Sequence, residues 1–215
     1  MRTRRLTPRT VAIAIAAAVT LLVSASSAQA GHWWLDSYGQ PVHLGGLGHT
    51  PTLGVENNAT NPNVRLAIYR AMLAWQTPGY LGIIEMPTGS GTHVRAADGY
   101  WGSTGWVGLA SPYYYNGANV LPGIDGNGHT HHFDVSMNMT YLGMSHLNNQ
   151  QYYDAVACHE LGHSVAALDD QTGTDPSCMA VGYGQRDYAW ETDARFRNPS
   201  PHDRDHVAYL WATLH

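Results

Sequence analysis

The chain has 215 residues, a formal net charge of −5, two cysteines and no lysine. Clustered basic residues for binding nucleic acid or anionic lipid are therefore not expected. The length suits one domain with a sizeable core. Few charges combined with many Gly, Tyr and Trp residues are typical of a loop-rich extracellular protein.

The first thirty residues have the pattern of a secretory signal peptide. Several arginines precede an apolar stretch from Val11 to Val23, and Ala28-Gln29-Ala30 matches an A-x-A cleavage site. The apolar run is short for a membrane span, and serines follow it. We therefore expect a signal peptide over 1–30 and a single secreted domain over 31–215, with no membrane partner. Removing the four arginines of the signal takes the net charge from −5 to −9.

The first half of the mature chain predicts one helix followed by strands. Residues 31–60 show no sustained period and indicate irregular chain with at most one short strand. A helix is predicted over 61–76, with Asn61 as N-cap and Pro62 at the first helical position. Runs of strand-forming residues between glycines predict strands over 81–86, 92–96, 106–110 and 135–141.

The second half predicts two helices. Residues 149–168 have a helical pattern, and a turn-rich stretch follows to about residue 188. The run 202–214 predicts a closing helix after a segment containing two prolines. No internal repeat or interdomain linker is present.

The run His159-Glu160-Leu161-Gly162-His163 is the strongest chemical signal in the chain. Histidines four apart lie on one face of a helix, about 5–6 Å apart at Cβ, so both can bind one metal ion. Glu160 lies one step round the helix, where it can hold and deprotonate a water on that metal. The pattern is the HExxH signature of zinc hydrolases. The alternative is a chance match on a solvated helix.

Cys158 and Cys178 suit a single disulfide in an oxidising compartment. Because Cys158 precedes His159, such a bridge would join the metal helix to the loop that follows it. Two free buried thiols, or zinc ligation by these cysteines, remain alternatives.

The order of helix, strands, HExxH helix, turn-rich loop and closing helix resembles the metzincin zinc peptidases, in particular their matrixin-like and snapalysin-like secreted bacterial members. The long metzincin motif, HExxHxxGxxH/D, is matched from His159 to Asp169, and Ser177-Cys178-Met179 follows where the family has its Met-turn. The helix ending at Trp75 and the strand over 135–142 are similar to the family's first helix and to the strand before its metal helix.

This resemblance implies an α+β, metzincin-like (zincin) catalytic domain, with a twisted mixed sheet, an N-terminal helix, a metal-binding helix and a C-terminal helix. It implies a secreted zinc-dependent endopeptidase in which Glu160 is the general base for a zinc-activated water. His159, His163 and Asp169 would be the ligands of one catalytic Zn²⁺, and Met179 would form an apolar floor beneath them. Protein or peptide substrates would bind in extended form at a sheet edge. A monomer is expected.

Two positions depart from the family pattern. Ala166 stands where the family usually has glycine, and Asp169 stands where histidine is usual. A carboxylate is an acceptable zinc ligand, and snapalysin-like enzymes use aspartate there. Other candidates for the third ligand are Asp170, Asp175 and Glu191.

Two further hypotheses concern other parts of the chain. The histidine-rich segment His129–Asp134, with Asp125, can hold a second, structural Zn²⁺ or Ca²⁺, although histidines on an exposed turn more often have no metal. A different functional class is a secreted, non-catalytic, zinc-stabilised binding or adhesion protein on a peptidase fold, in which aromatic segments such as Trp33-Trp34 make the contacts. The presence of Glu160 favours an enzyme, because a purely structural metal site does not need this carboxylate.

Overall fold

The computed structural model describes residues 43–44, 52–90, 93–116, 119–123, 129–166, 168, 176–180 and 193–213. The predicted signal peptide and most of the segment 31–51 lie outside these residues. Within the described ranges, no helix combines the length and the apolar character needed to cross a membrane.

Strands form one large sheet and one small one. The strands are β1 (His43–Leu44), β2 (Thr52–Asn57), β3 (Gly82–Met86), β4 (Val94–Gly99), β5 (Gly108–Asn116), β6 (Asn119–Pro122), β7 (His129–Thr130) and β8 (His132–Asn138). The large sheet has six strands in the order β3-β2-β4-β8-β5-β6, and β1 pairs with β7 separately. β3, β2, β4 and β8 run parallel, while β5 runs antiparallel to both β8 and β6.

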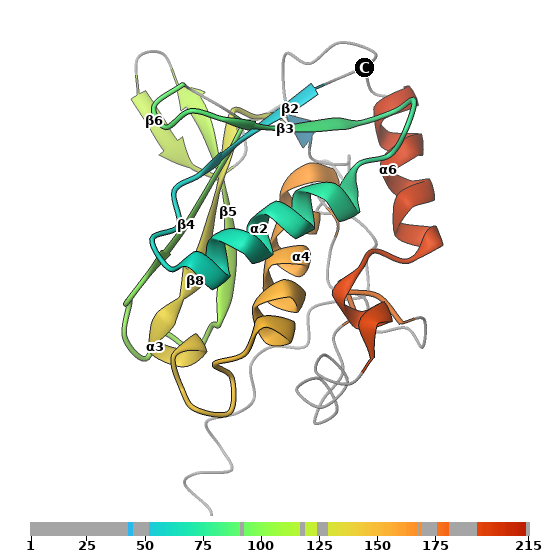
Figure 1. Cartoon of the computed structure of the whole chain (residues 1–215). Coiled ribbons are helices and arrows are strands. Elements are labelled where there is room, and N and C mark those ends of the chain that lie inside the picture. The colour runs from blue at the N-terminus through green and yellow to red at the C-terminus, as the bar shows by residue number, and fades with distance from the viewer. Residues whose placement is uncertain are drawn as a thin grey trace, which may run out of the picture.

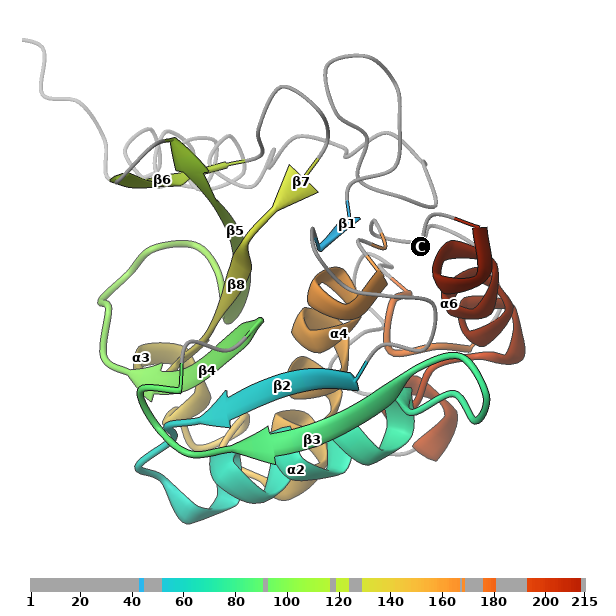
Figure 2. The same cartoon turned by 90° about the horizontal axis from the view of Figure 1, so that it is seen from above.

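The helices are α2 (Pro62–Trp75), α3 (Met139–Leu142), α4 (Gln150–Ala166), α6 (Pro201–Thr213) and the 3₁₀ helix η1 (Ala194–Arg197). α2 and α4 cover one face of the sheet, and α6 and η1 pack against α4. Figures 1 and 2 show α2 and α4 side by side against the sheet, with α6 on the far side of α4. The core lies between these layers, and its largest fully buried side chains include Trp75, Phe133, Tyr153 and Trp211. The fold is mixed α and β, consistent with the expected α+β class.

The helix predicted over 61–76 is confirmed. The Asn61 side chain accepts hydrogen bonds from the N–H groups of Asn63 and Val64, at 2.9 and 3.4 Å, and Pro62 begins the helix. One side of α2 is buried against the sheet and α4. The helix ends at Trp75, whose side chain is fully buried.

The predicted strands differ from the observed ones mainly at their ends. The strand predicted over 135–141 begins earlier, at His132, and stops at Asn138, because the Asn138 side chain accepts the Thr140 N–H at 3.0 Å and starts α3. The strand predicted over 106–110 begins at Gly108 and continues to Asn116. Pro112 does not end it, because proline is tolerated where a strand needs no N–H donor.

Candidate metal centre

The helix that carries the HExxH run is held by tryptophans from two other helices. The indole Nε1–H of Trp75, in α2, donates to the carbonyl of Cys158 at 2.8 Å. The indole of Trp211, in α6, donates to the carbonyl of Val165 at 3.1 Å. Both indoles are buried, so the second half of α4 is anchored at each end.

The two histidines of the run point their Nε2 atoms at each other. His159 Nδ1 lies 2.8 Å from the carbonyl oxygen of Cys178, and His163 Nδ1 bonds to the carbonyl of Leu168. A carbonyl only accepts, so each Nδ1 carries the hydrogen and, in a neutral ring, each Nε2 carries the lone pair. The two Nε2 atoms are 3.0 Å apart.

This geometry fits a zinc ion. Tetrahedral zinc with Zn–N bonds of 2.0–2.1 Å places two ligand nitrogens about 3.3 Å apart. The lone pairs of the two Nε2 atoms repel each other. A cation placed between the two atoms is attracted to both lone pairs. Metal-bound histidines usually donate their other ring N–H to a carbonyl or carboxylate, as His159 and His163 do here.

Glu160 lies against the start of β5, where the strand approaches α4 closely. A Cβ atom added to Gly108 would lie 2.5 Å from Glu160 Oε1 and 2.7 Å from Val156 Cγ1. Only glycine fits at this position without movement of the carboxylate. Gly108 was not predicted as a site residue, although an isolated glycine in a strand pattern signals a close approach.

The predicted disulfide is confirmed. Cys158 and Cys178 are bonded, with their Cα atoms 5.9 Å apart, and the bridge joins α4 to the segment 176–180. The same segment provides the carbonyl that accepts the His159 Nδ1–H. The covalent link and the hydrogen bond therefore hold one piece of chain beside the histidine pair.

Met179 is fully buried beside α4. A Cβ atom at Gly162 would collide with the Met179 sulfur and would lie 2.5 Å from Trp75 Cζ2. Gly162 and Glu160 lie on opposite sides of the helix, so the thioether and the carboxylate flank the histidine face. The role of Met179 as a Met-turn beneath a metal stays a prediction.

The closing helix holds the segment 176–180 through a buried carboxylate. Asp203 Oδ2 accepts the Ser200 N–H at 2.6 Å and the hydroxyl of Ser177, and Ser177 Oγ accepts the Met179 N–H at 3.1 Å. Asp203 N–H in turn donates to Ser200 Oγ at 3.2 Å, which completes a capping box at the start of α6. The Ser-x-x-Asp spacing is the sequence signal for this cap, which was not predicted.

The candidates for the third metal ligand, Asp169, Asp170, Asp175 and Glu191, lie outside the described residues. In the part of the chain that the structure describes, no group of three or more His, Cys, Asp or Glu side chains is placed to hold a metal ion. Of the predicted metal ligands, the described residues therefore include His159 and His163, whose Nε2 atoms lie together. The carbonyl of Leu168, directly before Asp169, accepts from His163, so the chain at this point lies against the pair.

In the histidine-rich segment, the described side chains contact Arg95 and one another. The Arg95 guanidinium contacts His132 Nε2, and Arg95 Nε donates to Asp134 Oδ1 at 2.8 Å. Burial lowers the pKa of His132, and the Arg95 charge lowers it further. His131 Nδ1 lies 3.0 Å from His132 Nδ1, so the two rings are in contact, and a second metal in this segment stays a prediction. The side chain of His129, and Asp125, lie outside the described residues.

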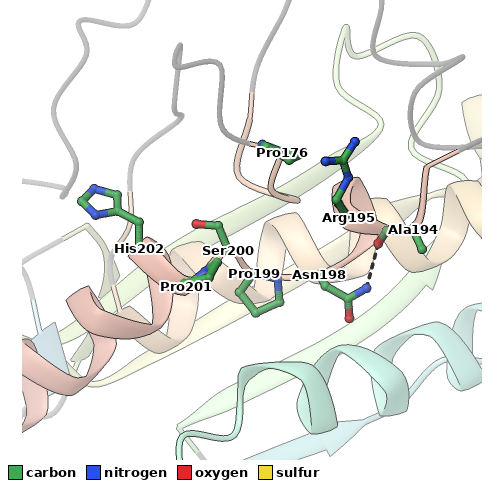
Figure 3. Close-up of a pocket in the computed structure, with 8 residues that line it drawn as sticks. All are labelled: Pro176, Ala194, Arg195, Asn198, Pro199, Ser200, Pro201 and His202. Carbon is green, nitrogen blue, oxygen red and sulfur yellow. Dashed lines mark hydrogen bonds between the residues drawn. The ribbon is translucent and has the colours of Figure 1, made fainter.

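A cavity of about 570 Å³ lies beside the N-terminus of α6 (Figure 3). The residues that line it are Pro176, Ala194, Arg195, Asn198, Pro199, Ser200, Pro201 and His202. It is bounded by the segments that support Met179, and the HExxH side chains do not line it. This cavity is therefore separate from the candidate metal centre.

Comparison of the sequence with protein-family models and with curated proteins finds no match. The family resemblance consequently rests on the HExxH run and the residues after it. The chemical interpretation rests on the geometry of His159, Glu160 and His163.

Proposed function

We propose that the chain is a secreted zinc-dependent endopeptidase of the metzincin type. The observation that carries the proposal is the convergence of His159 and His163 Nε2 at 3.0 Å, with both Nδ1 atoms bonded to backbone carbonyls. The buried Glu160 carboxylate beside them supplies the group that hydrolysis needs and a structural metal site does not.

His159 and His163 would hold the zinc, with Asp169 as the proposed third ligand. A bound zinc ion supplies Lewis acidity, lowering the pKa of a water molecule towards 7 and polarising a substrate carbonyl. Glu160 accepts the proton of the attacking water at its carboxylate and then delivers it to the leaving amine. The close contact with Gly108 restricts the carboxylate to one side of the helix, which orients it for both transfers.

The first half of β5 provides an edge for a substrate. β6 pairs with residues 113–116 of β5 and the Gly123 N–H bonds to the Pro112 carbonyl, so in the described part of the sheet no strand lies outside residues 108–111. Asn138 N–H bonds to the Val107 carbonyl, and bonding directions alternate along antiparallel strands. Gly108 and Ala110 therefore direct their backbone groups away from β8, towards an incoming extended peptide beside Glu160.

The direct test is hydrolysis of unfolded casein by residues 31–215 with zinc bound, with zinc removed by a chelator, and with zinc restored. We expect cleavage only in the two zinc-containing samples. Circular dichroism of all three samples would show that the fold persists without the metal. A folded, zinc-bound chain that cleaves neither casein nor a broad peptide library would instead support the non-catalytic binding protein.

Replacing Gly108 by alanine should separate catalysis from metal binding. The added methyl group must displace the Glu160 carboxylate, and a misplacement of about 1 Å at a catalytic group can cost about 100-fold in rate. We expect kcat to fall by about this factor, while zinc affinity, measured by competition with a chelating dye, stays within a factor of three. Ser111→Ala, which changes the opposite face of the same strand, is the matched control and should behave like the parent chain. Equal kcat values for Gly108→Ala and the parent would contradict the assigned position of Glu160.

A further inference from the structure

A second pair of histidines four residues apart lies on the closing helix. His202 and His206 are in the first two turns of α6, and we call them the α6 pair. Their ring centroids are 4.2 Å apart, compared with 4.6 Å for His159 and His163. Side chains at this spacing lie on one face of a helix, so both imidazoles can reach one metal ion.

The α6 pair lies at the surface, where water can complete the coordination of a metal. His202 is exposed and His206 is half-buried. In Figure 3 the His202 ring extends away from the other side chains that line the cavity. Because the core does not enclose these rings, small side-chain rotations can place one nitrogen of each about 3.3 Å apart, the separation that tetrahedral zinc requires.

The charges around the α6 pair suit a cation. Asp205 is exposed and lies about one turn after the first histidine, whereas Arg204 lies on the opposite side of the helix. Arg195, on the rim of the adjoining cavity, is bonded to the carboxylate of Asp193. The positive end of the helix dipole opposes a cation here, but the buried Asp203 carboxylate at the same helix end offsets it.

Two imidazoles favour one class of metal. Imidazole nitrogen is a ligand for divalent transition metals such as Zn²⁺, whereas Ca²⁺ and Mg²⁺ take oxygen ligands. Among the described residues no third His, Cys, Asp or Glu side chain joins the α6 pair as a ligand group, so water would fill the remaining positions. Because the loss of one ligand is expected to cost at least about 100-fold, the α6 pair should bind zinc at least that much more weakly than a three-ligand centre.

The α6 pair spans the helical turn that supports the segment 176–180. Asp203, which lies between the two histidines in the sequence, accepts the Ser177 hydroxyl, and Ser177 Oγ accepts the Met179 N–H at 3.1 Å. A metal bound to both histidines joins the first two turns of α6 and keeps them helical. It therefore also holds in place the carboxylate that fixes Ser177.

We propose that the α6 pair is a transition-metal site, separate from the candidate metal centre, that binds Zn²⁺ and stabilises the start of α6. This site does not depend on peptide hydrolysis, because it uses a different helix and different ligands. Zinc well below the Kd of the α6 pair occupies only the tighter centre on α4, so the two sites can be studied apart.

The test is a calorimetric zinc titration of residues 31–215. We expect one tight binding event and a second event with a Kd at least about 100-fold higher. His202→Ala and His206→Ala should each weaken the second event by at least about 100-fold and leave the first unchanged. His146→Ala, which removes an exposed histidine between α3 and α4, is the matched control and should keep both events.

Hydrogen exchange then locates the second event. Zinc at ten times the higher Kd should slow amide exchange in the first two turns of α6 by about 10-fold in the parent, because opening these turns releases the metal. The same zinc should have no such effect in His206→Ala. A parent with no second event, or a second event unchanged in both alanine variants, would overturn the proposal. Absence of the tight event alone would contradict the candidate metal centre and leave the test of the α6 pair intact.

Discussion

Zinc-loaded Glu160→Ala is expected to hydrolyse peptides about 10²- to 10⁴-fold more slowly than the parent chain, the range that a positioned general base contributes. The loss should appear in kcat, because the carboxylate acts on a proton during the reaction. Zinc affinity should stay close to that of the parent, since both histidines and their carbonyl partners remain. Steady-state kinetics on a quenched-fluorescence peptide and a zinc titration measure the two effects separately.

Two controls sharpen this experiment. Glu160→Gln keeps the shape against Gly108 but cannot accept the proton, so its kcat should fall as far as that of the alanine variant. Glu85→Ala removes a carboxylate whose partner Arg65 lies 3.6 Å away on the surface, and it should leave kcat unchanged. A zinc-bound Glu160→Gln that keeps more than a tenth of the parental kcat would mean that another group is the base.

Replacing His163 by alanine is expected to weaken zinc binding by at least 100-fold. Loss of a group that merely supports a metal ligand typically costs 10- to 100-fold in affinity, so removal of one of the two placed nitrogens should cost more. The effect extends to stability, because zinc at 100 times its Kd stabilises a folded chain by about 2.7 kcal/mol. The variant should therefore lose the rise in Tm that zinc gives the parent.

The matched control for that prediction is His146→Ala. His146 is exposed in the connection between α3 and α4, away from the HExxH run. Its removal should leave both the zinc titration and the zinc-dependent rise in Tm as in the parent. Zinc affinity within a factor of three of the parent for His163→Ala would show that the metal is held elsewhere.

Features with local causes were predictable from the sequence. The start of α2 follows from Asn61, whose side chain caps nearby N–H groups, and from Pro62 at the first helical position. These contacts all lie within one helical turn. The helix that carries the HExxH run was predicted over 149–168 and is observed as α4, Gln150–Ala166. The disulfide was predicted from the number of cysteines, because two cysteines have one way to pair.

Features that depend on contacts between distant segments were not predictable in this way. Asn138 lies in a strand, β8, as predicted, but the roles of its side chain were not predictable: it caps α3 and bonds to Gly102 and Thr104, more than 30 residues earlier in the chain. The contact of Gly108 with Glu160 exists only once β5 lies against α4. The bond between Ser177 and Asp203 likewise joins segments 26 residues apart.

The disulfide also sets an order of assembly. The carbonyl that orients His159 belongs to Cys178, and the residue before His159 is its disulfide partner. Reduction leaves the carbonyl tied to the metal helix only by weaker contacts, and closing a loop of this length covalently contributes about 3 kcal/mol in the chain-entropy model. Under the proposed function, the metal centre is therefore expected to form after the disulfide, so that activity appears only in an oxidising compartment.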